Sequence, residues 1–336
     1  VTVFDQETCL PMRYVDVGKS PGIESPHMIR VSPDGKYWYV VFTGGGYIQR
    51  YLTSNESFAG EVSIGSGNWN TITISSDSKR AFIVDWSSNG KIAYLDLDAM
   101  SLIQTWAGAM LYEYPHGGAI NKTNDTLYVT GQTGNYIYKV PVSDPASPIQ
   151  ISLQQPPYET YVPPVTTSIL DMHEIVFSPD YSKYFVTCQK TNQVRVVKTS
   201  NDSLLSVISV GLYPQELSIS KNTKYLFVSC PEDTVSFPGS RGSVAVIDYT
   251  TNTLVKKIFT GFQPHGLVVD DVKHLVYVAN RNVTNSGPAP HHLSVCGGRN
   301  GYLTIIDMVT MQLVKNNDGS DKRIELSVDP YSAAIR

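Results

Sequence analysis

A repeating unit runs through this 336-residue chain and constrains its fold more than any other feature. The clearest copy is PHMIRVSPDGKYWYV, from Pro26 to Val40, in which a Pro and a polar residue open an alternating strand. A Ser-Pro-Asp-Gly turn then leads into a strand of aromatic and β-branched residues. Related copies begin at Trp69, Pro115, Met172, Pro214 and Pro264, and a short seventh copy, PYSAAIR, begins at Pro330. A repeat of this length indicates the overall architecture even before the individual strands are assigned.

A second element lies between the copies and supplies two further strands. Examples are KIAYLDLDAMSLIQTW, QVRVVKTSNDSLLSVI, SVAVIDYTTNTLVKKI and YLTIIDMVTMQLV, and the amino-terminal VTVFDQETCLPMRYV has the same pattern. Four short strands per unit, repeated seven times, are typical of a β-propeller. We therefore predict an all-β fold, a seven-bladed β-propeller of four-stranded antiparallel blades. It would be one domain over residues 1–336, with blade openings near 26, 69, 115, 172, 214, 264 and 330.

The two ends of the chain complement each other in this prediction. The amino terminus supplies the third and fourth strands that the unit opening at Pro330 lacks, which favours a closed ring over an open solenoid. We expect the last blade to be closed by N- and C-terminal strands. Its second strand is missing from the sequence, so we expect that blade to be incomplete or the chain to be trimmed.

Composition supports the all-β prediction and excludes several functions. The chain has 21 Tyr, 25 Gly and 20 Pro, and it lacks the apolar run of roughly 20 residues that a membrane span needs. With 26 basic and 30 acidic residues it lacks the basic surplus of nucleic-acid-binding proteins. We therefore expect no nucleic acid and no transmembrane segment. Because Val1 is not an initiator Met, we interpret the chain as mature or trimmed, with room for a lipid anchor upstream.

Four of the seven His occupy equivalent positions. We call the second residue of each repeat opening the slot. His27, His116, His173 and His265 fill four slots, and Asn70, Gln215 and Tyr331 fill the others. In a propeller the first strand of each blade is the innermost, so the slots are expected near the axis on one face. Imidazole is the commonest transition-metal ligand near neutral pH, and ordinary hydrogen-bonded histidines are the alternative.

The long loops on the same face add further candidates. Residues 281–301 contain His291, His292, Cys296 and Arg299, and we expect the two histidines to close a metal site and Arg299 to contact a ligand. Glu174 and Glu216 follow slots and could orient an imidazole, although solvated or Arg-paired acids are the alternative. Cys188 and Cys230 end equivalent second strands, and a Cys230–Cys296 bridge, thiolate ligation and buried free thiols all remain open. A face rich in Tyr and His could hold a flat macrocycle or a protein partner.

The repeats resemble those of the YVTN-repeat propellers, including YncE-like and surface-layer-type proteins. The resemblance rests on the Pro-x opening, the Ser32–Gly35 turn, and strands such as LVYVAN from Leu275 followed by GYLTIID from Gly301. It implies an extracytoplasmic location in the periplasm or at the cell surface. More distantly, the slot histidines are similar to those of nitrous-oxide reductase, a propeller that holds copper, and to the haem d1 propeller of cytochrome cd1 nitrite reductase, which holds a tetrapyrrole. Asn70, Gln215 and Tyr331 depart from the histidine pattern of the reductase.

These observations lead to one preferred function and two alternatives. The preferred function is an extracytoplasmic propeller that coordinates a transition metal, copper before zinc, through the histidines named above. One alternative is a protein-interaction scaffold in a cell-surface or outer-membrane assembly, and the other is a redox or tetrapyrrole-binding propeller. Hydrolase and nucleotide-binding motifs are absent, so no catalytic residue is assigned.

Overall fold

The computed structural model describes residues 1–336 except 21–23, 108–110, 134–135, 154–169, 240–241 and 284–299. The chain divides into two compact units. Unit 1 comprises Val1–Asp16, Asn192–Val194 and Val207–Ile335, and unit 2 comprises Val17–Thr191, Arg195–Ser206 and Arg336. No helix in the described part of the chain is long and apolar enough to cross a membrane.

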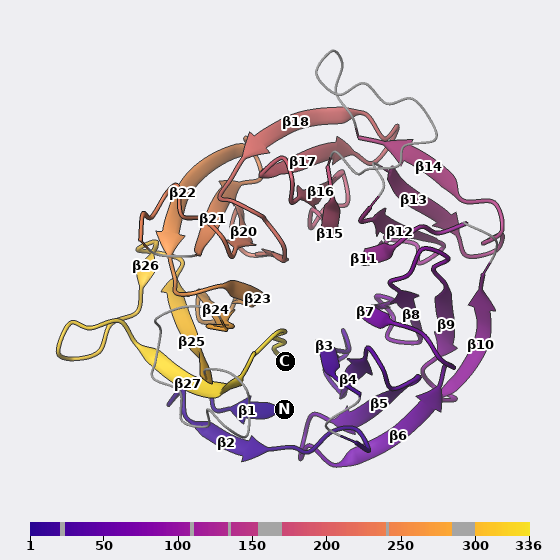
Figure 1. The fold of residues 1–336 in the computed structure, drawn as a ribbon, viewed down its shortest axis with the longest axis horizontal. Coiled ribbons are helices and arrows are strands. Elements are labelled where there is room, and N and C mark those ends of the chain that lie inside the picture. The colour runs from indigo at the N-terminus through magenta and orange to yellow at the C-terminus, as the bar shows by residue number, and fades with distance from the viewer. Residues whose placement is uncertain (21–23, 108–110, 134–135, 154–169, 240–241, 284–299) are drawn as a thin grey trace. The chain divides into compact units, whose positions relative to one another are not determined.

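Unit 2 is built from four consecutive antiparallel sheets, which are its blades (Figure 1). The first blade contains β3 (Pro26–Val31), β4 (Tyr37–Phe42), β5 (Tyr47–Leu52) and β6 (Phe58–Ser63). The second contains β7 (Trp69–Ile74), β8 (Arg80–Asp85), β9 (Ile92–Asp96) and β10 (Ser101–Trp106). The third contains β11 (Pro115–Ile120), β12 (Thr126–Gly131), β13 (Tyr136–Pro141) and β14 (Ile149–Ser152). The fourth contains β15 (Met172–Phe177), β16 (Lys183–Cys188), β17 (Gln193–Lys198) and β18 (Leu204–Ser209), and the two units divide within its last two strands.

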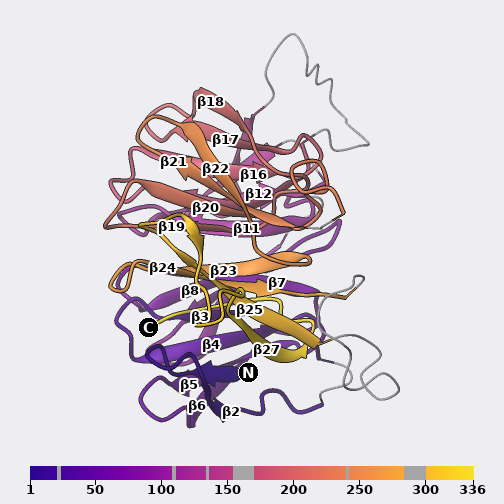
Figure 2. The same ribbon diagram turned by 90° about the vertical axis from the view of Figure 1, so that its left-hand side faces the viewer.

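Unit 1 contains the two remaining blades and a short sheet. The fifth blade consists of β19 (Leu217–Ile219), β20 (Tyr225–Cys230), β21 (Ser243–Asp248) and β22 (Thr253–Phe259). The sixth consists of β23 (Pro264–Asp270), β24 (Leu275–Asn280), β25 (Asn300–Asp307), β26 (Gln312–Leu313) and β27 (Arg323–Val328). Strand β27 pairs with β25, and Figure 2 shows the two side by side. Strands β1 (Thr2–Phe4) and β2 (Pro11–Tyr14) form a two-stranded sheet.

The expectation of seven four-stranded blades is wrong. Among the described residues, six sheets have four or five strands, and the seventh sheet has only β1 and β2. Asp329 adopts the same left-handed backbone as the residues before other openings (φ 54°), but the residues after Pro330 form no strand. The C-terminal strand β27 joins the sixth blade instead of closing a seventh. The seventh repeat is too short to supply strands to a blade of its own.

The second strand of a blade packs on both of its faces, which explains why its sequence is continuously apolar. In β8, Ala81 and Ile83 pack against the first blade, whereas Phe82 and Val84 pack against the third. Alternate side chains of a strand point to opposite faces, so a strand covered on both sides needs apolar residues at every position. In unit 1, Val276 and Val278 of β24 pack toward the fifth blade, while Tyr277 packs with Cys9.

The blade openings share a local backbone that positions the slot. The residue before the opening has a positive φ in six repeats: Ser25, Tyr114, Asp171, Tyr213, Gln263 and Asp329. The register between the first and second strands then shifts directly after the opening residue, as between Pro115 and Gly118 or between Pro264 and Leu267. The slot residue lies inside this β-bulge. Bulges redirect side chains and are common beside functional sites.

Candidate functional site

Three slot histidines lie together in unit 2. The ring centroids of His27 and His116 are 6.4 Å apart, and those of His116 and His173 are 3.8 Å apart. His116 and His173 are 4% and 2% exposed. The first strands that carry them are neighbours along the blade series, because β3 contacts β7, β7 contacts β11 and β11 contacts β15. The repeat therefore collects these imidazoles from separate blades, as the slot pattern predicted.

Two of these histidines, His27 and His116, are tied to the next blade through their Nδ1 atoms. His27 Nδ1 is 3.1 Å from the carbonyl oxygen of Asn70, and His116 Nδ1 is 3.1 Å from the carbonyl oxygen of His173. A carbonyl oxygen only accepts hydrogen bonds, so Nδ1 carries the proton in the neutral ring. The lone pair is then on Nε2. Histidines that bind metals commonly donate their other ring N–H to a carbonyl or carboxylate in this way.

A hydroxyl group supports the same contact at His116. Thr130 Oγ1 on β12 donates to the carbonyl of His173 (2.9 Å) and accepts from the backbone N–H of Gly117 (2.8 Å). Glycine is required at 117, because a Cβ there would lie 2.5 Å from the carbonyl oxygen of His173. The fourth and fifth blades repeat the hydroxyl contact, with Thr187 accepting from the N–H of Glu174 and Ser229 from the N–H of Glu216.

Burial keeps His116 neutral. Desolvation by burial and, to a smaller extent, the nearby His27 lower the pKa of His116 to about 3, and the hydrogen bond to the His173 carbonyl opposes both effects. A neutral imidazole is the form that binds a metal ion. His116 therefore offers a lone pair at neutral pH with little competition from protons.

The remaining slot histidine has a similar environment in unit 1. His265 Nδ1 is 2.9 Å from the carbonyl oxygen of Tyr331, which is the slot residue of the last repeat. The two rings pack with centroids 3.7 Å apart. Gly266 allows this approach, since a Cβ there would lie 2.7 Å from the same carbonyl oxygen. The Nδ1 contact between consecutive slots thus occurs in both units.

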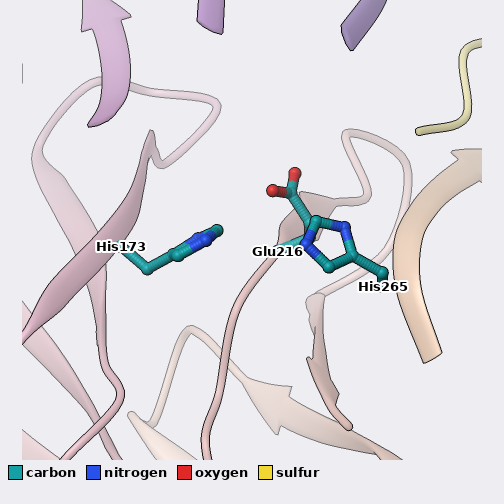
Figure 3. A group of neighbouring side chains, drawn as sticks. All are labelled: His173, Glu216 and His265. Carbon is teal, nitrogen blue, oxygen red and sulfur yellow. The ribbon is translucent and has the colours of Figure 1, made fainter. Parts of the chain in front are cut away.

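Glu216 is the acidic residue beside His265. A carboxylate oxygen of Glu216 and a ring nitrogen of His265 lie within 4.8 Å of each other, and both residues are buried. Figure 3 draws this pair together with His173, which is described with unit 2. Imidazole and carboxylate together are a common donor pair for transition metals.

The ring of Tyr331, which packs against His265, also contacts an ion pair. The guanidinium of Arg281 lies 4.8 Å from the ring centroid of Tyr331, and it forms a two-point ion pair with Asp329. Burial raises the pKa of the Tyr331 phenol to about 12, with smaller contributions from Glu216 and Asp329, while Arg281 opposes the rise. Tyr331 therefore remains a neutral phenol at physiological pH.

The other candidates named from the sequence are placed as follows. The carbonyl of Asn70 contacts Nδ1 of His27, and the backbone N–H of Gln215 donates to the carbonyl of Ser229. Glu174 is buried, and its Oε1 accepts the N–H of Ile175. Cys188 and Cys230 are buried, and burial raises the pKa of Cys230 to about 12, so Cys230 is not a thiolate. His291, His292, Cys296 and Arg299 lie outside the described residues.

Sequence reasoning missed two parts of this arrangement. It did not identify Thr130, although Thr130, Thr187 and Ser229 stand at equivalent positions of their second strands and an alignment of those strands would have revealed the repeated hydroxyl. It also missed Arg281 and Asp329. These two residues are 48 positions apart, and no local pattern connects them.

Comparisons with known proteins identify the fold. No protein-family model and no curated protein matches the chain. Among solved structures, hydrazine synthase from Kuenenia stuttgartiensis has a TM-score of 0.67 at 15% identity, covering 96% of this chain and 93% of that chain. The dihydro-heme d1 dehydrogenase NirN in complex with DHE has a TM-score of 0.60 at 15% identity, covering 98% and 71%.

The fold is an all-β propeller. Likeness at this identity shows the fold alone, and function has to be argued from the site. The resemblance to YVTN-repeat proteins stays a prediction.

Proposed function

We propose that this chain is an extracytoplasmic propeller that binds a transition-metal ion, copper before zinc, through its slot histidines. The observation that carries the proposal is the Nδ1 contact of His27, His116 and His265 with the slot carbonyl of the following repeat. This contact fixes the tautomer and directs the lone pair to Nε2.

The spacing of His27 and His116 favours copper. A metal–nitrogen distance of about 2.0–2.1 Å places an imidazole centroid about 3.2 Å from the ion, so two such centroids lie at most about 6.4 Å apart. The observed 6.4 Å therefore suits donors on opposite sides of an ion, as in a square-planar Cu(II) site. A tetrahedral zinc ion would bring the two centroids to about 5.2 Å.

The pair of Glu216 and His265 supports a mixed nitrogen and oxygen donor set in unit 1. Their donor atoms lie within 4.8 Å, which is close enough for one ion to contact both. The carbonyl of Tyr331 fixes the proton of His265 on Nδ1, so the lone pair that a metal ion would bind is on Nε2.

Metal titration of the purified, metal-stripped protein tests the proposal. We expect Cu(II) to bind more tightly than Zn(II), and His116→Ala to weaken Cu(II) binding by at least tenfold. The matched control is His274→Asn, because His274 is an exposed residue with a left-handed backbone that asparagine tolerates. Binding no tighter than that of a surface histidine, or equal loss in both variants, would contradict the proposal.

A tetrapyrrole is the second candidate, and one specific comparison favours it. The similar structure NirN is by its name a dihydro-heme d1 dehydrogenase, and it was determined in complex with DHE. A visible absorption spectrum of the isolated protein distinguishes the two candidates. A strong absorption band from a macrocycle, with metal analysis showing no free copper or zinc, would favour the tetrapyrrole.

A further inference from the structure

The motif Asn-x-Ser/Thr, the acceptor signal for N-linked glycans, occurs five times in this chain, and the proposed metal site does not use it. The copies begin at Asn55, Asn121, Asn124, Asn201 and Asn282. A transferase that attaches a glycan has to reach the side-chain nitrogen Nδ2 of the asparagine. The exposure and the hydrogen bonds of each amide therefore separate accessible copies from inaccessible ones.

Three of the five amides are engaged by the fold. Asn282 is 0% exposed, and its Nδ2 donates to a backbone carbonyl at 2.9 Å. Asn121 Nδ2 donates to the carboxylate of Asp125 (2.7 Å), and Asn124 Nδ2 donates to Ser76 Oγ (2.9 Å). Both of these asparagines are only partly exposed. A glycan on any of the three would compete with a hydrogen bond that the folded chain makes.

Asn201 is exposed in the turn between β17 and β18 of the fourth blade. Its Oδ1 accepts from the hydroxyl of Ser203 (2.9 Å) and from the N–H of Ser203 (3.3 Å). Asparagine commonly forms such a turn with the backbone two residues further on. Within the described part of the chain, Asn201 Nδ2 donates no hydrogen bond. The amide and the hydroxyl of the signal are therefore held side by side at the surface, with both amide protons available.

The middle residue of this signal anchors the turn to the blade. The carboxylate of Asp202 lies 3.0 Å from Lys139 Nζ, and the Tyr184 hydroxyl donates to it at 3.4 Å. Asp202 is partly buried, whereas its two neighbours in the signal are exposed. The anchoring contacts thus hold the inner side of the turn and leave the acceptor side open.

The first blade repeats this turn between β5 and β6. The sequences TSNES from Thr53 and TSNDS from Thr199 differ only in the acidic residue. Asn55 is exposed, and its Oδ1 accepts the N–H of Ser57 at 3.0 Å. The acidic residue has a φ of 58° in this turn and of 56° in the other, so the two backbones match. The first and fourth blades therefore present the same signal in the same conformation.

We infer that Asn201 is a site of N-linked glycosylation, with Asn55 as a second site in the equivalent turn. Nδ2 attacks the anomeric carbon of a sugar that is carried on a polyprenyl-phosphate lipid. The carbon–nitrogen bond forms while the bond from that carbon to the phosphate oxygen breaks, the lipid phosphate leaves with the electron pair, and Nδ2 loses one proton. The inference rests on the extracytoplasmic location in the proposed function, because N-linked glycans mark surface loops of secreted proteins, and it is independent of metal binding.

Peptide mass spectrometry of the chain, purified from the cells that naturally produce it, tests the inference. Trypsin cleaves after Lys198 and Lys221, so Asn201 lies in the peptide of residues 199–221. We expect this peptide to carry a glycan on Asn201 and to release sugar fragment ions, and we expect Asn282 to be unmodified. Fractionation of the same cells separates the possible failures. An unmodified Asn201 in an extracytoplasmic chain overturns this inference alone, whereas an unmodified Asn201 in a cytoplasmic chain overturns the proposed location as well.

Variants produced in the same cells identify the attachment atom. Asn201→Gln removes the acceptor amide and Ser203→Ala removes the hydroxyl of the signal, so each should reduce glycan on this peptide to background. Ser203→Thr keeps the signal and should keep the glycan. The matched control is Asn124→Gln, which should leave the glycan mass of the chain unchanged. A glycan that persists on the peptide in Asn201→Gln would lie on a neighbouring hydroxyl and would overturn the inference. Copper titration of Asn201→Gln should match that of the original chain, so the outcome does not bear on the metal site.

Discussion

The Nδ1 atom of His116 donates a hydrogen bond to the carbonyl oxygen of His173, so one slot histidine is oriented by the backbone of the next. The same relationship joins His265 to Tyr331 and His27 to Asn70. The repeat therefore does more than gather imidazoles. It also sets which nitrogen of each ring carries the proton, because the backbone carbonyl at the following slot accepts a hydrogen bond from Nδ1.

Thr130 should stabilise the third blade through its hydroxyl. In Thr130→Val, the buried N–H of Gly117 loses its acceptor, and we expect the free energy of unfolding to fall by about 1–3 kcal/mol. Thr130→Ser keeps the hydroxyl and should lose about 1 kcal/mol or less, for the missing methyl group. Chemical denaturation of both variants provides the measurement, and an equal loss would show that the hydroxyl contact is unimportant.

Gly117 should be less tolerant of a side chain than its neighbour Gly118. In Gly117→Ala the new Cβ would lie 2.5 Å from the carbonyl oxygen of His173, which is backbone and cannot move away easily. We expect a loss of about 1–3 kcal/mol in the free energy of unfolding. In Gly118→Ala the nearest atom is the Thr73 hydroxyl, which can rotate, so the loss should be smaller. Thermal and chemical unfolding of the two variants, compared side by side, tests this order.

His116 should make the metal-stripped protein sensitive to acid. Its pKa is lowered to about 3 in the folded protein, whereas an unfolded His has a pKa near 6.5. Between these values the unfolded chain binds a proton that the folded chain does not, so stability is complete above about pH 6.5 and falls as the pH decreases toward 3. The contribution of this residue should be up to about 1.4 kcal/mol per pH unit.

The control for this acid effect is His116→Gln, which cannot titrate. Its free energy of unfolding should depend less steeply on pH between 6.5 and 3 than that of the original chain. Identical slopes for the two proteins would mean that His116 is protonated in the folded state.

Much of the architecture could be predicted from the sequence, because the repeat records it directly. The two-sided packing of second strands predicts runs such as AFIV in β8, and the slot pattern predicted that His27, His116 and His173 would meet. The blade number could not be read in this way. The opening at Pro330 has the same local pattern as the others, but a blade also needs strands to pair with it, and the residues after Pro330 form none.

The hydrogen bonds and ring contacts of the site could not be predicted from the sequence, for a physical reason. The groups that accept from Nδ1 are backbone carbonyls, which every residue has, so residue type carries no sign of them. The contact of Arg281 with Tyr331 and Asp329 depends on how β23, β24 and β27 place their ends, which is a tertiary property. Sequence patterns report the periodicity of strands better than they report such contacts.

Tyr331 should act on His265 through its ring rather than through its hydroxyl. The ring contacts both His265 and Arg281, whereas the hydrogen bond to His265 Nδ1 is made by the backbone carbonyl, which every substitution of the side chain keeps. Tyr331→Phe keeps the stack, so its affinity for Cu(II) should stay within about twofold of the original. Tyr331→Leu removes the stack, and groups that orient a metal ligand typically contribute 10–100-fold to affinity, so we expect a loss of about tenfold. Copper titration, with circular dichroism to confirm folding, provides the comparison. If Tyr331→Phe loses as much affinity as Tyr331→Leu, the hydroxyl is the group that matters and the stack is not what holds His265.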